Sequence, residues 1–351
     1  MPLIIRYGEI SLKKGKRREF ENKLVENLRM KIKRKGYEGK IIRKHGRIIV
    51  EGNVPPEIVA KTPGVVSVSP ADIVKEDEIE EYIGEKFRDL SPKSFRITVQ
   101  RIDKRYPKTS MEIAREIGDF FVKKFGWKVN LSNPDLEIFI EVIDRELYFF
   151  TEKIEGVGGL PVGTQGKLLS LISGGMDSPV ATFLMMRRGA EITALHFSQG
   201  YEDDVRKIVN ILSDIHPVEF IVENHNELLS PYISNLRRKE WICVICKYLM
   251  LKRAGEIARE IGALGIVMGD SLGQVASQTL ENLYIESTAT DLPIYRPLIG
   301  LDKVEIERYA RKIGTYDLMV PCMCSFAPKR VITRGKMEEF LEVAKHIGLL
   351  E

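Results

Sequence analysis

The stretch Leu168-Leu-Ser-Leu-Ile-Ser-Gly-Gly-Met-Asp-Ser-Pro179 decides the fold. Its apolar first half predicts a buried strand of a parallel sheet. The closing proline suits the start of a helix, where its missing N–H costs nothing. A strand, a glycine-rich loop and a helix N-terminus together bind phosphate, because backbone N–H groups and the positive end of the helix dipole point at the anion. Gly174 and Gly175 permit close approach, and Ser173 and Ser178 add hydroxyl donors.

The carboxylate of Asp177 defines the kind of phosphate site. It would repel a bare phosphate, so it predicts a bridging divalent cation, Mg²⁺. The loop lacks the Gly-Lys-Ser/Thr ending of a Walker A loop. Residues 173–178 instead resemble the SGGxDS signature of the PP-loop ATP pyrophosphatases, which cleave ATP between the α and β phosphates to adenylate a substrate. A plain strand-to-helix turn also favours Gly, Ser and Asp, but six matching positions after an apolar strand favour an ATP site.

Length and composition set the class of protein. The chain has 351 residues, 44% of them hydrophobic, which is enough for two or three domains with separate cores. No apolar run is long enough to span a membrane, and the N-terminus lacks the apolar stretch of a signal peptide. The four Cys fall in two close pairs, which is not the pattern of a disulfide scaffold. A cytoplasmic protein without a membrane partner is predicted.

Charge is distributed unevenly along the chain. Residues 1–50 contain 16 Lys and Arg against five Asp and Glu, a net of +11, whereas the whole chain carries +4 and the remainder therefore −7. A basic module joined to a mildly acidic one predicts a polyanionic partner held at one end. The alternative for charge alone is a solvated helix face.

Residues 1–70 predict a small α+β domain. Its elements are a strand over residues 2–7, a helix after residue 18, a strand over 40–50, and a second helix and strand over 57–61 and 65–69. In the first helix, apolar residues recur every four positions and form a stripe that we expect to pack in the core; they are Phe20, Leu24, Leu28 and Ile32. The opposite face is expected to be exposed and basic, with Lys23, Arg29, Lys31 and Lys35.

A second α+β module begins near Ile73. Acidic residues 76–81 open a helix, a strand covers 95–101, a helix covers 110–125, and a strand over 135–142 returns through a hairpin as 146–152. The basic loop over residues 101–108 is suited to grip phosphates without reading sequence, although such a loop taken alone is more often solvated.

The glycine-rich segment 156–166 marks a domain junction. Beyond it, strands over 168–172, 191–197, 217–223 and 264–268 alternate with helices over 179–188, 202–213 and 244–261. That alternation predicts a doubly wound parallel sheet, whose ligands bind at the carboxyl ends of the strands.

The whole chain resembles the ThiI-type tRNA 4-thiouridine synthetases (tRNA uridine 4-sulfurtransferases). Residues 6–20 resemble the family's ferredoxin-like entry motif; Ser110, residues 133–135 and residues 151–163 resemble its RNA-binding THUMP domain; residues 171–178 and 268–279 resemble its PP-loop domain. The implied architecture is an α/β, doubly wound parallel-sheet PP-loop domain over residues 164–351. It is preceded by a ferredoxin-like α+β domain over 1–70 and an α+β THUMP domain over 71–163.

The resemblance implies particular ligand positions. The ATP-binding set, with Asp177 also catalytic, is Leu171, Ile172, Ser173, Gly174, Gly175, Asp177, Ser178, His196, Phe197, Lys247, Gly269 and Gln278. The chemistry agrees, since strand-end backbone atoms suit the adenine, a lysine neutralises phosphate charge and a glycine permits close approach. A histidine at a strand end and an amide on a helix surface are the plainer alternatives for His196 and Gln278. The tRNA-binding set is Lys13, Lys14, Lys16, Arg17, Arg18, Arg101, Lys104, Arg105 and Lys108.

The cysteines raise the question of where the sulfur comes from. The resemblance places a catalytic Cys at Cys324, after a proline. Many bacterial members carry sulfur as a persulfide on a C-terminal rhodanese domain, and because this sequence ends at Glu351 that domain is expected to be missing. Some archaeal-type members instead hold an iron–sulfur cluster on three Cys, which would be Cys243, Cys246 and Cys324, with Cys322 spare or an alternative. Thiolates at this spacing suit a [4Fe–4S] or related cluster, and also zinc. A plain thiol or disulfide pair is the third alternative.

The predicted reaction is ATP-dependent sulfur transfer to a tRNA uridine, in the family at position 8, giving 4-thiouridine, AMP and pyrophosphate. The sulfur donor is sulfide or a persulfide supplied by a cysteine desulfurase. A homodimer is left open. The alternatives are another PP-loop tRNA thiolation, such as 2-thiouridine synthesis, and a non-catalytic tRNA-binding protein.

Overall fold

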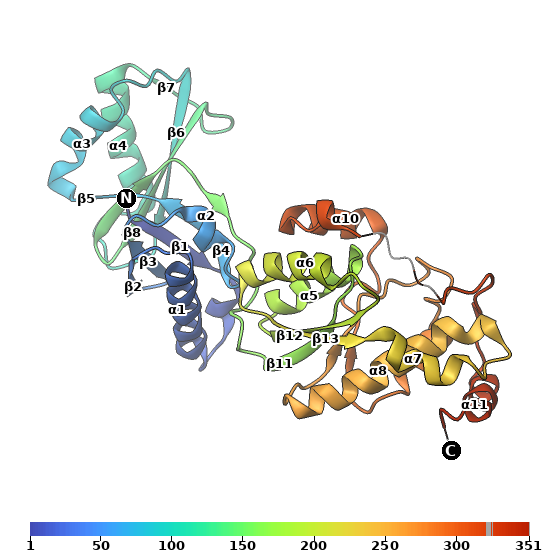
Figure 1. The fold of residues 1–351 in the computed structure, drawn as a ribbon. Helices are drawn as coiled ribbons and strands as arrows, with labels where there is room; N and C mark the ends of the chain where they lie inside the picture. Colours follow the sequence, from blue (N-terminus) through green and yellow to red (C-terminus); the bar gives the residue numbers. More distant parts are fainter. Residues whose placement is uncertain (321–323, 325, 351) are drawn as a thin grey trace. The chain divides into compact units, whose positions relative to one another are not determined.

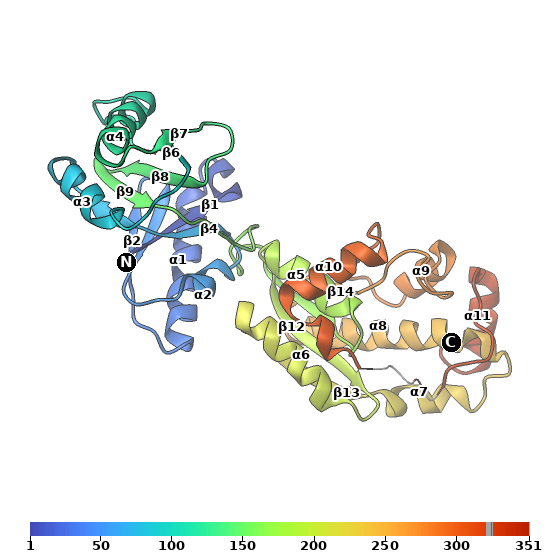
Figure 2. The same ribbon diagram turned by 90° about the horizontal axis from the view of Figure 1, so that it is seen from above.

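The computed structural model describes residues 1–320, 324 and 326–350. The described residues form two compact units, Met1–Pro161 and Val162–Glu351, drawn as ribbons in Figures 1 and 2. Within the described ranges, no helix combines the length and the apolar character needed to cross a membrane. The first unit is of the α+β class and the second is built on a parallel sheet, which confirms the predicted fold class.

The first sheet of unit Met1–Pro161 has the strand order β10-β4-β1-β3-β2, with antiparallel neighbours. Its elements are β1 (Leu3–Tyr7), η1 (Glu9–Leu12), α1 (Arg17–Arg34), β2 (Lys40–Lys44), β3 (Arg47–Glu51), α2 (Pro56–Ala60), β4 (Val65–Pro70) and β10 (Ile154–Glu155). Strand β10 follows the second module in the chain but pairs with β4. The segment after residue 153, which lies in the range predicted for the second domain, therefore completes the first sheet.

Helix α1 buries the predicted apolar stripe. Phe20, Leu24, Leu28 and Ile32 all lie in the core of the first sheet. The expected exposed basic face is wrong at Lys31, which is only 4% exposed. The reason is helical geometry, since a residue seven positions after Leu24 returns to the same face of the helix. The aliphatic stem of a lysine can lie along such an apolar surface.

The single strand predicted over residues 40–50 is wrong. The structure has a tight hairpin there, in which β2 and β3 pair with Lys44 opposite Arg47. The turn residues are His45 and Gly46, and Gly46 has a φ of 69°. Glycine takes up such a positive φ at little cost, and a two-residue turn of this kind closes a hairpin.

The second sheet of this unit has the strand order β5-β9-β8-β6-β7. Its elements are β5 (Asp72–Val74), η2 (Glu76–Glu78), α3 (Ile79–Lys86), β6 (Ser94–Arg101), α4 (Ser110–Phe125), β7 (Lys128–Val129), β8 (Leu136–Ile143) and β9 (Glu146–Phe150). Helix α4 is fixed at both ends: Thr109 and Glu112 form a capping box at the start, and Gly126 ends the helix with a φ of 69°.

A buried carboxylate joins these sheets. Glu141 on β8 is 2% exposed. It accepts hydrogen bonds from Arg6 Nε at 2.6 Å and from Arg47 Nε at 2.7 Å, both on the first sheet. Burial by itself raises the pKa of Glu141, but the hydrogen bond from Arg47 and the charges of Arg6 and Arg47 lower it below its usual value. The carboxylate is therefore held ionised between two guanidinium groups.

Unit Val162–Glu351 contains a parallel sheet of order β13-β12-β11-β14-β15. Its elements are β11 (Lys167–Leu171), α5 (Asp177–Arg187), β12 (Glu191–Ser198), α6 (Glu202–Ile215), β13 (Glu219–Asn224), α7 (His225–Ile233), η3 (Lys239–Trp241), α8 (Ile242–Glu260), β14 (Ile266–Val267), α9 (Leu280–Ser287), β15 (Ile294–Tyr295), α10 (Lys303–Ile313), η4 (Tyr316–Leu318) and α11 (Met337–His346). In Figure 1, α5, α6 and α10 cover one face of this sheet and α8 the other. The strand order reverses at β11, where ligands bind in sheets of this type.

The N-terminal part of α8 extends past the sheet and carries a core of its own. Helices α7, α9 and α11 gather around it (Figure 2). Trp241, Ile285 and Phe340, from the helix start, α9 and α11, are fully buried together. This helical subdomain presents the start of α8, and with it Cys243 and Cys246, to the rest of the unit.

The buried ion pair of Glu141 gives a stability prediction. Glu141→Ala would leave Arg6 and Arg47 without their common partner, so we expect the free energy of unfolding to fall by about 3–5 kcal/mol. The control is Glu137→Ala on the same strand, because the side chain of Glu137 is 24% exposed and pairs with Arg96; that variant is expected to lose about 1 kcal/mol or less. Urea denaturation measures both. Equal losses would contradict the account.

Candidate active site

The loop between β11 and α5 lies at the carboxyl edge of the parallel sheet. Ser178 Oγ accepts a hydrogen bond from Ser173 N at 2.8 Å and lies 3.1 Å from Ser173 Oγ. Gly175 N donates to Ser173 Oγ at 3.3 Å. The loop is thus closed upon itself by its own serines. Helix α5 begins at Asp177, two residues before the predicted start, and Pro179 falls in its first turn, where an N–H has no intrahelical partner.

Gly269 supports this loop from the neighbouring strand. It follows β14, and a Cβ at this position would meet Ser178 N at 2.8 Å and Ser178 Cα at 2.9 Å. The sequence predicts that this glycine permits close approach of ATP. The structure gives it another reason: only a glycine lets the end of β14 pack against the start of α5.

Asp177 has one carboxylate oxygen with a partner and one without. Gln274 Nε2 donates to Asp177 Oδ2 at 3.1 Å, whereas Asp177 Oδ1 is buried and has no hydrogen-bond partner among the described residues. Burial raises the pKa of Asp177 more than Gln274 and Lys303 lower it. A buried oxygen without a donor calls for a ligand, and a carboxylate oxygen is the ligand type that Mg²⁺ prefers. The residues present therefore fit a divalent cation.

A buried cluster of charges centred on Asp270 lies behind the loop. Its carboxylate accepts from Lys247 Nζ at 2.9 Å, Gln278 Nε2 at 3.3 Å and Arg296 Nε at 3.0 Å. Burial by itself raises the pKa of Asp270, but Lys247 and Arg296 lower it overall. Two residues predicted to bind ATP, Lys247 and Gln278, are thus oriented by one carboxylate that the sequence did not single out.

Glu286 adds a second carboxylate to this cluster. It is fully buried, and its Oε2 lies 3.7 Å from Lys247 Nζ. Neither of its oxygens has a hydrogen-bond partner among the described residues. Burial raises its pKa to about 8, in spite of the charge of Lys247. At neutral pH, Lys247 and Arg296 therefore face one ionised carboxylate, Asp270, and leave an excess positive charge that suits a polyphosphate.

A cavity of about 220 Å³ opens beside the loop. It is lined by Ile172, Ser173, Gly174, His196, Phe197, Gln199, Tyr201, Val205, His225, Met250, Val320 and Cys324. His196 Nδ1 lies 3.0 Å from the carbonyl oxygen of Ile172, so Nδ1 carries the proton and Nε2 is an acceptor. Nε2 has no partner within the described part of the chain. Burial lowers the pKa of His196, which keeps the ring neutral.

Cys324 reaches the same cavity because its segment is tied to the loop. Val320 N donates to Gly174 O at 2.9 Å, and a Cβ on Gly174 would meet Val320 Cβ at 3.0 Å. Gln199 Nε2 lies 4.0 Å from Cys324 Sγ and 2.9 Å from His225 Nδ1. The phosphate loop and a thiol therefore share one cavity.

The free thiols among the described residues are Cys243, Cys246 and Cys324; Cys322 lies outside the described residues. His225 Nε2 is 3.1 Å from Cys246 Sγ. Burial, and then the nearby Cys324, raises the pKa of Cys246 to about 12. Thiols have the softness that iron and zinc prefer, but in the described part of the chain no three His, Cys, Asp or Glu side chains converge closely enough to hold a metal ion. The cluster that the resemblance implies therefore stays a prediction.

Comparison with known proteins identifies the family of the chain. The model described as thiamine biosynthesis protein (ThiI) matches residues 163–349, that of the ThiI ferredoxin-like domain residues 2–69, and that of the THUMP domain residues 74–152. A probable tRNA sulfurtransferase of Thermococcus kodakarensis is 44% identical, over 97% of this chain and 95% of its own. One from Methanocaldococcus jannaschii is 36% identical, over 100% and 98%. The chain belongs to the ThiI family of tRNA sulfurtransferases.

Solved structures of ThiI-like proteins agree with this fold. A crystal structure of a 4-thiouridine synthetase in complex with RNA and bound ATP superposes with a TM-score of 0.87 at 32% identity, covering 99% of this chain and 94% of that one. The structure of PH1313 from Pyrococcus horikoshii has a TM-score of 0.71 at 28% identity, covering 89% and 99%. The predicted family resemblance is confirmed.

The ThiI-type site residues predicted from sequence fall into two groups in the structure. Ile172, Ser173, Gly174, His196 and Phe197 line the cavity. Lys247 and Gln278 instead meet at the buried cluster around Asp270, and Leu171 ends β11 just before the loop. Their contacts with ATP stay predictions.

Sequence reasoning missed the residues that orient the site. Asp270 and Gln274 lie inside the quoted motif over residues 268–279, so attention to its other polar positions would have found them. Arg296, Glu286 and His225 lie on separate elements, and no local pattern marks them. Only the fold brings them to Lys247 and Cys246.

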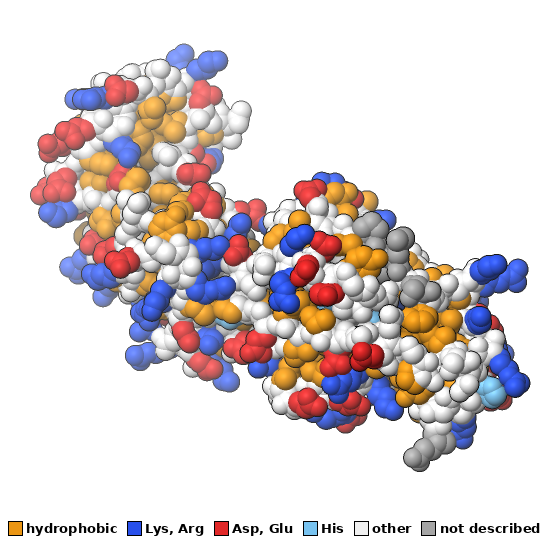
Figure 3. All heavy atoms as spheres, viewed as in Figure 1, with side chains coloured by type: hydrophobic (Ala, Val, Ile, Leu, Met, Phe, Trp, Pro, Cys, Tyr) orange, Lys and Arg blue, Asp and Glu red, His pale blue; other side chains and the backbone are white. Residues whose placement is uncertain are grey.

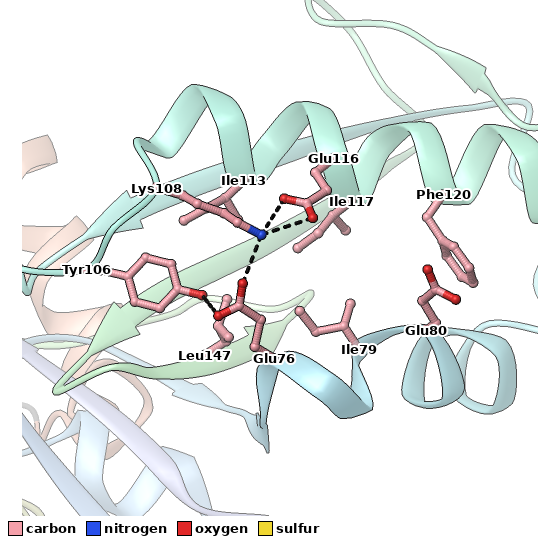
Figure 4. A pocket seen from close by; sticks show the side chains of 10 residues that line it. All are labelled: Glu76, Ile79, Glu80, Tyr106, Lys108, Ile113, Glu116, Ile117, Phe120 and Leu147. Atoms are coloured by element: carbon pink, nitrogen blue, oxygen red, sulfur yellow. Dashed lines mark hydrogen bonds and ion pairs between the residues drawn. The ribbon is translucent and has the colours of Figure 1, made fainter.

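The basic loop predicted to bind tRNA is largely paired within the protein. Lys108 Nζ lies between Glu76 and Glu116, at 2.8 and 2.7 Å, beside a small cavity of about 100 Å³ (Figure 4). Arg101 donates to the carbonyl oxygens of Tyr106 and Lys108, and Arg105 pairs with Asp103. Lys104 is exposed. RNA binding by this loop stays a prediction, and Lys104 is its most accessible cation.

The basic cluster near the N-terminus is more exposed than that loop. Lys14, Lys16 and Arg18 are exposed. Arg17 pairs with Glu21 and donates to the Tyr7 hydroxyl, and Lys13 Nζ lies 5.4 Å from the centre of the Phe20 ring. The exposed members of this cluster remain candidates for contact with tRNA phosphates.

The packing of Gly269 against the loop gives a prediction for ligand binding. Gly269→Ala would push Ser178 out of place, and we expect the affinity for MgATP to fall at least about tenfold, because a displaced loop misaligns its phosphate donors. Gly300→Ala is the matched control, since a Cβ there meets nothing within 4 Å. Calorimetric titration with MgATP measures both variants. Equal affinities would show that the close packing does not position the loop.

Proposed function

We propose that this chain catalyses ATP-dependent transfer of sulfur to uridine 8 of tRNA, giving 4-thiouridine, AMP and pyrophosphate. The observation that carries the proposal is the shared cavity, which has the phosphate loop on one side and Cys324 on the other. The relatives named as tRNA sulfurtransferases and the 4-thiouridine synthetase solved with RNA and ATP support it.

In the first step, the loop of residues 173–178 would hold the triphosphate of ATP. Backbone N–H groups of the loop and the N-terminus of α5, which begins at Asp177, would face the phosphates. Asp177, with its free Oδ1, would hold Mg²⁺, which supplies charge neutralisation when bound. Uracil O4 attacks the α-phosphorus and pyrophosphate leaves. Lys247 and Arg296 stabilise the charge that develops on the phosphates, while Asp270 keeps both in position.

The apolar part of the cavity would bind the adenine. Phe197 and Met250 offer apolar surface, and His196 Nε2 is a buried acceptor without a partner among the described residues. The exocyclic amine of adenine is a donor that can satisfy it. A neutral histidine fixed by the Ile172 carbonyl is therefore well suited to recognise ATP.

In the second step, sulfur attacks C4 of the adenylated uridine and AMP leaves. Cys324 lies in the cavity, and with bound sulfide beside it this step needs no reductant. If the sulfur is instead the outer atom of a Cys324 persulfide, its attack leaves that atom bonded to both C4 and Cys324 Sγ. A thiol of an added dithiol would then attack Cys324 Sγ, so that a disulfide forms and 4-thiouridine is released. Cys246 is a poor nucleophile by comparison, because at a pKa of about 12 it stays protonated at neutral pH. No step requires a metal cluster.

The test is the nucleoside that the protein makes. We expect unmodified tRNA incubated with the protein, MgATP and sulfide to yield 4-thiouridine by mass spectrometry, with one AMP per thiolated uridine. Asp177→Ala is expected to lower product formation by at least 100-fold, because it removes the cation ligand beside the phosphates, while tRNA affinity is unchanged. Asp203→Ala, on the exposed start of α6, is the control and should retain activity.

Other outcomes of this assay would overturn the proposal. A different thiolated nucleoside, such as 2-thiouridine, would point to another tRNA thiolation, and tRNA binding without any product would point to a non-catalytic role. Iron, zinc and acid-labile sulfide are measured in the same anaerobic preparation. Activity that rises in proportion to cluster content would contradict sulfur transfer without a cluster.

A further inference from the structure

Two short segments of the second unit are strongly basic. Residues 326–336 contain Lys329, Arg330, Arg334 and Lys336 and no Asp or Glu, and residues 237–239 read Arg-Arg-Lys. The chain beyond residue 50 is acidic on balance, with a net charge of −7. This concentration of positive charge therefore stands out against its own background.

The fold places these segments side by side. Ile332 N donates to Glu240 O at 3.0 Å, and Asn282 Nδ2 donates to Ile332 O at 2.9 Å. Gly335 packs closely on Trp241, since a Cβ there would meet the indole ring at 2.9 Å. The two segments are thus held by buried contacts against the start of α8.

Most of these cations have no partner in the part of the chain that the structure describes. Among the described residues, no hydrogen bond or ion pair involves the exposed side chains of Arg237, Lys239, Lys329, Arg330, Arg334 and Lys336. We call these six residues the second basic surface. Lys and Arg side chains are visible in Figure 3 at the end of this unit where α7 and α11 lie. Only Arg238, between them, is tied down, by Glu240 and Glu339.

The position of the second basic surface is unfavourable for the protein alone. Arg237 and Lys239 precede the N-terminus of α8, a helix of 19 residues without an acidic residue in its first turn. The one carboxylate between these cations and α8, that of Glu240, pairs with Arg238. Cations at the positive end of a helix dipole repel it. An anionic partner would relieve this repulsion, and the unpaired side chains are free to bind it.

A groove runs between the two segments and adjoins the active-site cavity. It has a volume of about 610 Å³ and three cations against one carboxylate in its lining, which consists of Ile233, Lys239, Glu240, Ile242, Phe326, Ala327, Pro328, Lys329 and Arg330. The ring of Phe326 lies 6.0 Å from that of His225, a residue of the cavity. Ala327 N donates to Cys324 O at 3.1 Å. The groove therefore continues directly from the segment that carries Cys324.

We propose that the second basic surface binds the tRNA backbone next to the target uridine and directs that uridine into the cavity at Cys324. Arg and Lys contacts with phosphates position a nucleic acid without reading its sequence, and the half-buried ring of Phe326, which lines the groove, offers aromatic surface to an unpaired base. The inference rests on the proposed function, since it assumes that tRNA is the substrate. The second basic surface would be a tRNA-binding surface in the catalytic unit, in addition to the one predicted for the N-terminal unit.

The experiment is equilibrium tRNA binding as a function of KCl concentration. The variant Lys329→Ala/Arg330→Ala removes two cations from the groove, and we expect tRNA affinity to fall about tenfold and the slope of log Kd against log salt to fall by about 1.5. The swap Lys329→Arg/Arg330→Lys keeps the charge and should bind as the unchanged protein does. Lys252→Ala, an exposed lysine farther along α8, controls for nonspecific charge loss and should have no effect.

Each outcome bears on the proposal. Unchanged affinity and salt slope in the double alanine variant would overturn it, and so would weaker binding with an unchanged slope. MgATP affinity is measured on every variant, so that a folding defect is seen separately. Failure of the unchanged protein to make 4-thiouridine would overturn the proposed function, whereas the binding data would still decide whether the second basic surface holds tRNA.

Discussion

The hydrogen bond from Val320 N to Gly174 O connects the phosphate loop with the chain just before Cys324. In the proposed reaction the phosphate loop would activate the substrate and Cys324 would take part in sulfur transfer, yet Gly174 and Cys324 are about 150 residues apart in the chain. At 2.9 Å, this bond and the contact of Val320 with Gly174 hold them at one cavity. Because Gly174 has no side chain, Val320 can pack against the loop, and a phosphate could approach the backbone closely.

The alternation of strands and helices between residues 168 and 268 was predicted from the sequence, whereas α7 and the elements from α9 onward were not. Apolar runs, glycine-rich loops and alternation suffice to predict a parallel sheet with the phosphate loop at its carboxyl edge. The strand predicted over 40–50 was wrong because a two-residue turn at His45 and Gly46 leaves the apolar pattern almost unbroken. Lys31 was wrongly predicted to be exposed because the prediction followed its charge and not its position on the apolar face of α1.

Only part of the candidate active site could be predicted from the sequence. The residues predicted to bind ATP lie in sequence motifs, but those that orient them act through tertiary contacts. Asp270 meets Lys247 of α8, Arg296 just after β15 and Gln278 of its own loop. The same holds for charge: the basic loop over residues 101–108 is largely neutralised by partners such as Glu76 and Glu116, whereas the unpaired cations of the second basic surface lie in the acidic part of the chain. Composition cannot distinguish a paired cation from a free one.

The central claim is that the loop and Cys324 perform successive steps in one cavity. The most direct measurement follows a single turnover of tRNA with α-labelled ATP and Cys324→Ser. The account predicts pyrophosphate release and labelled, adenylated tRNA at the normal rate, with no 4-thiouridine. Normal 4-thiouridine formation by this variant, or the loss of pyrophosphate release, would contradict it.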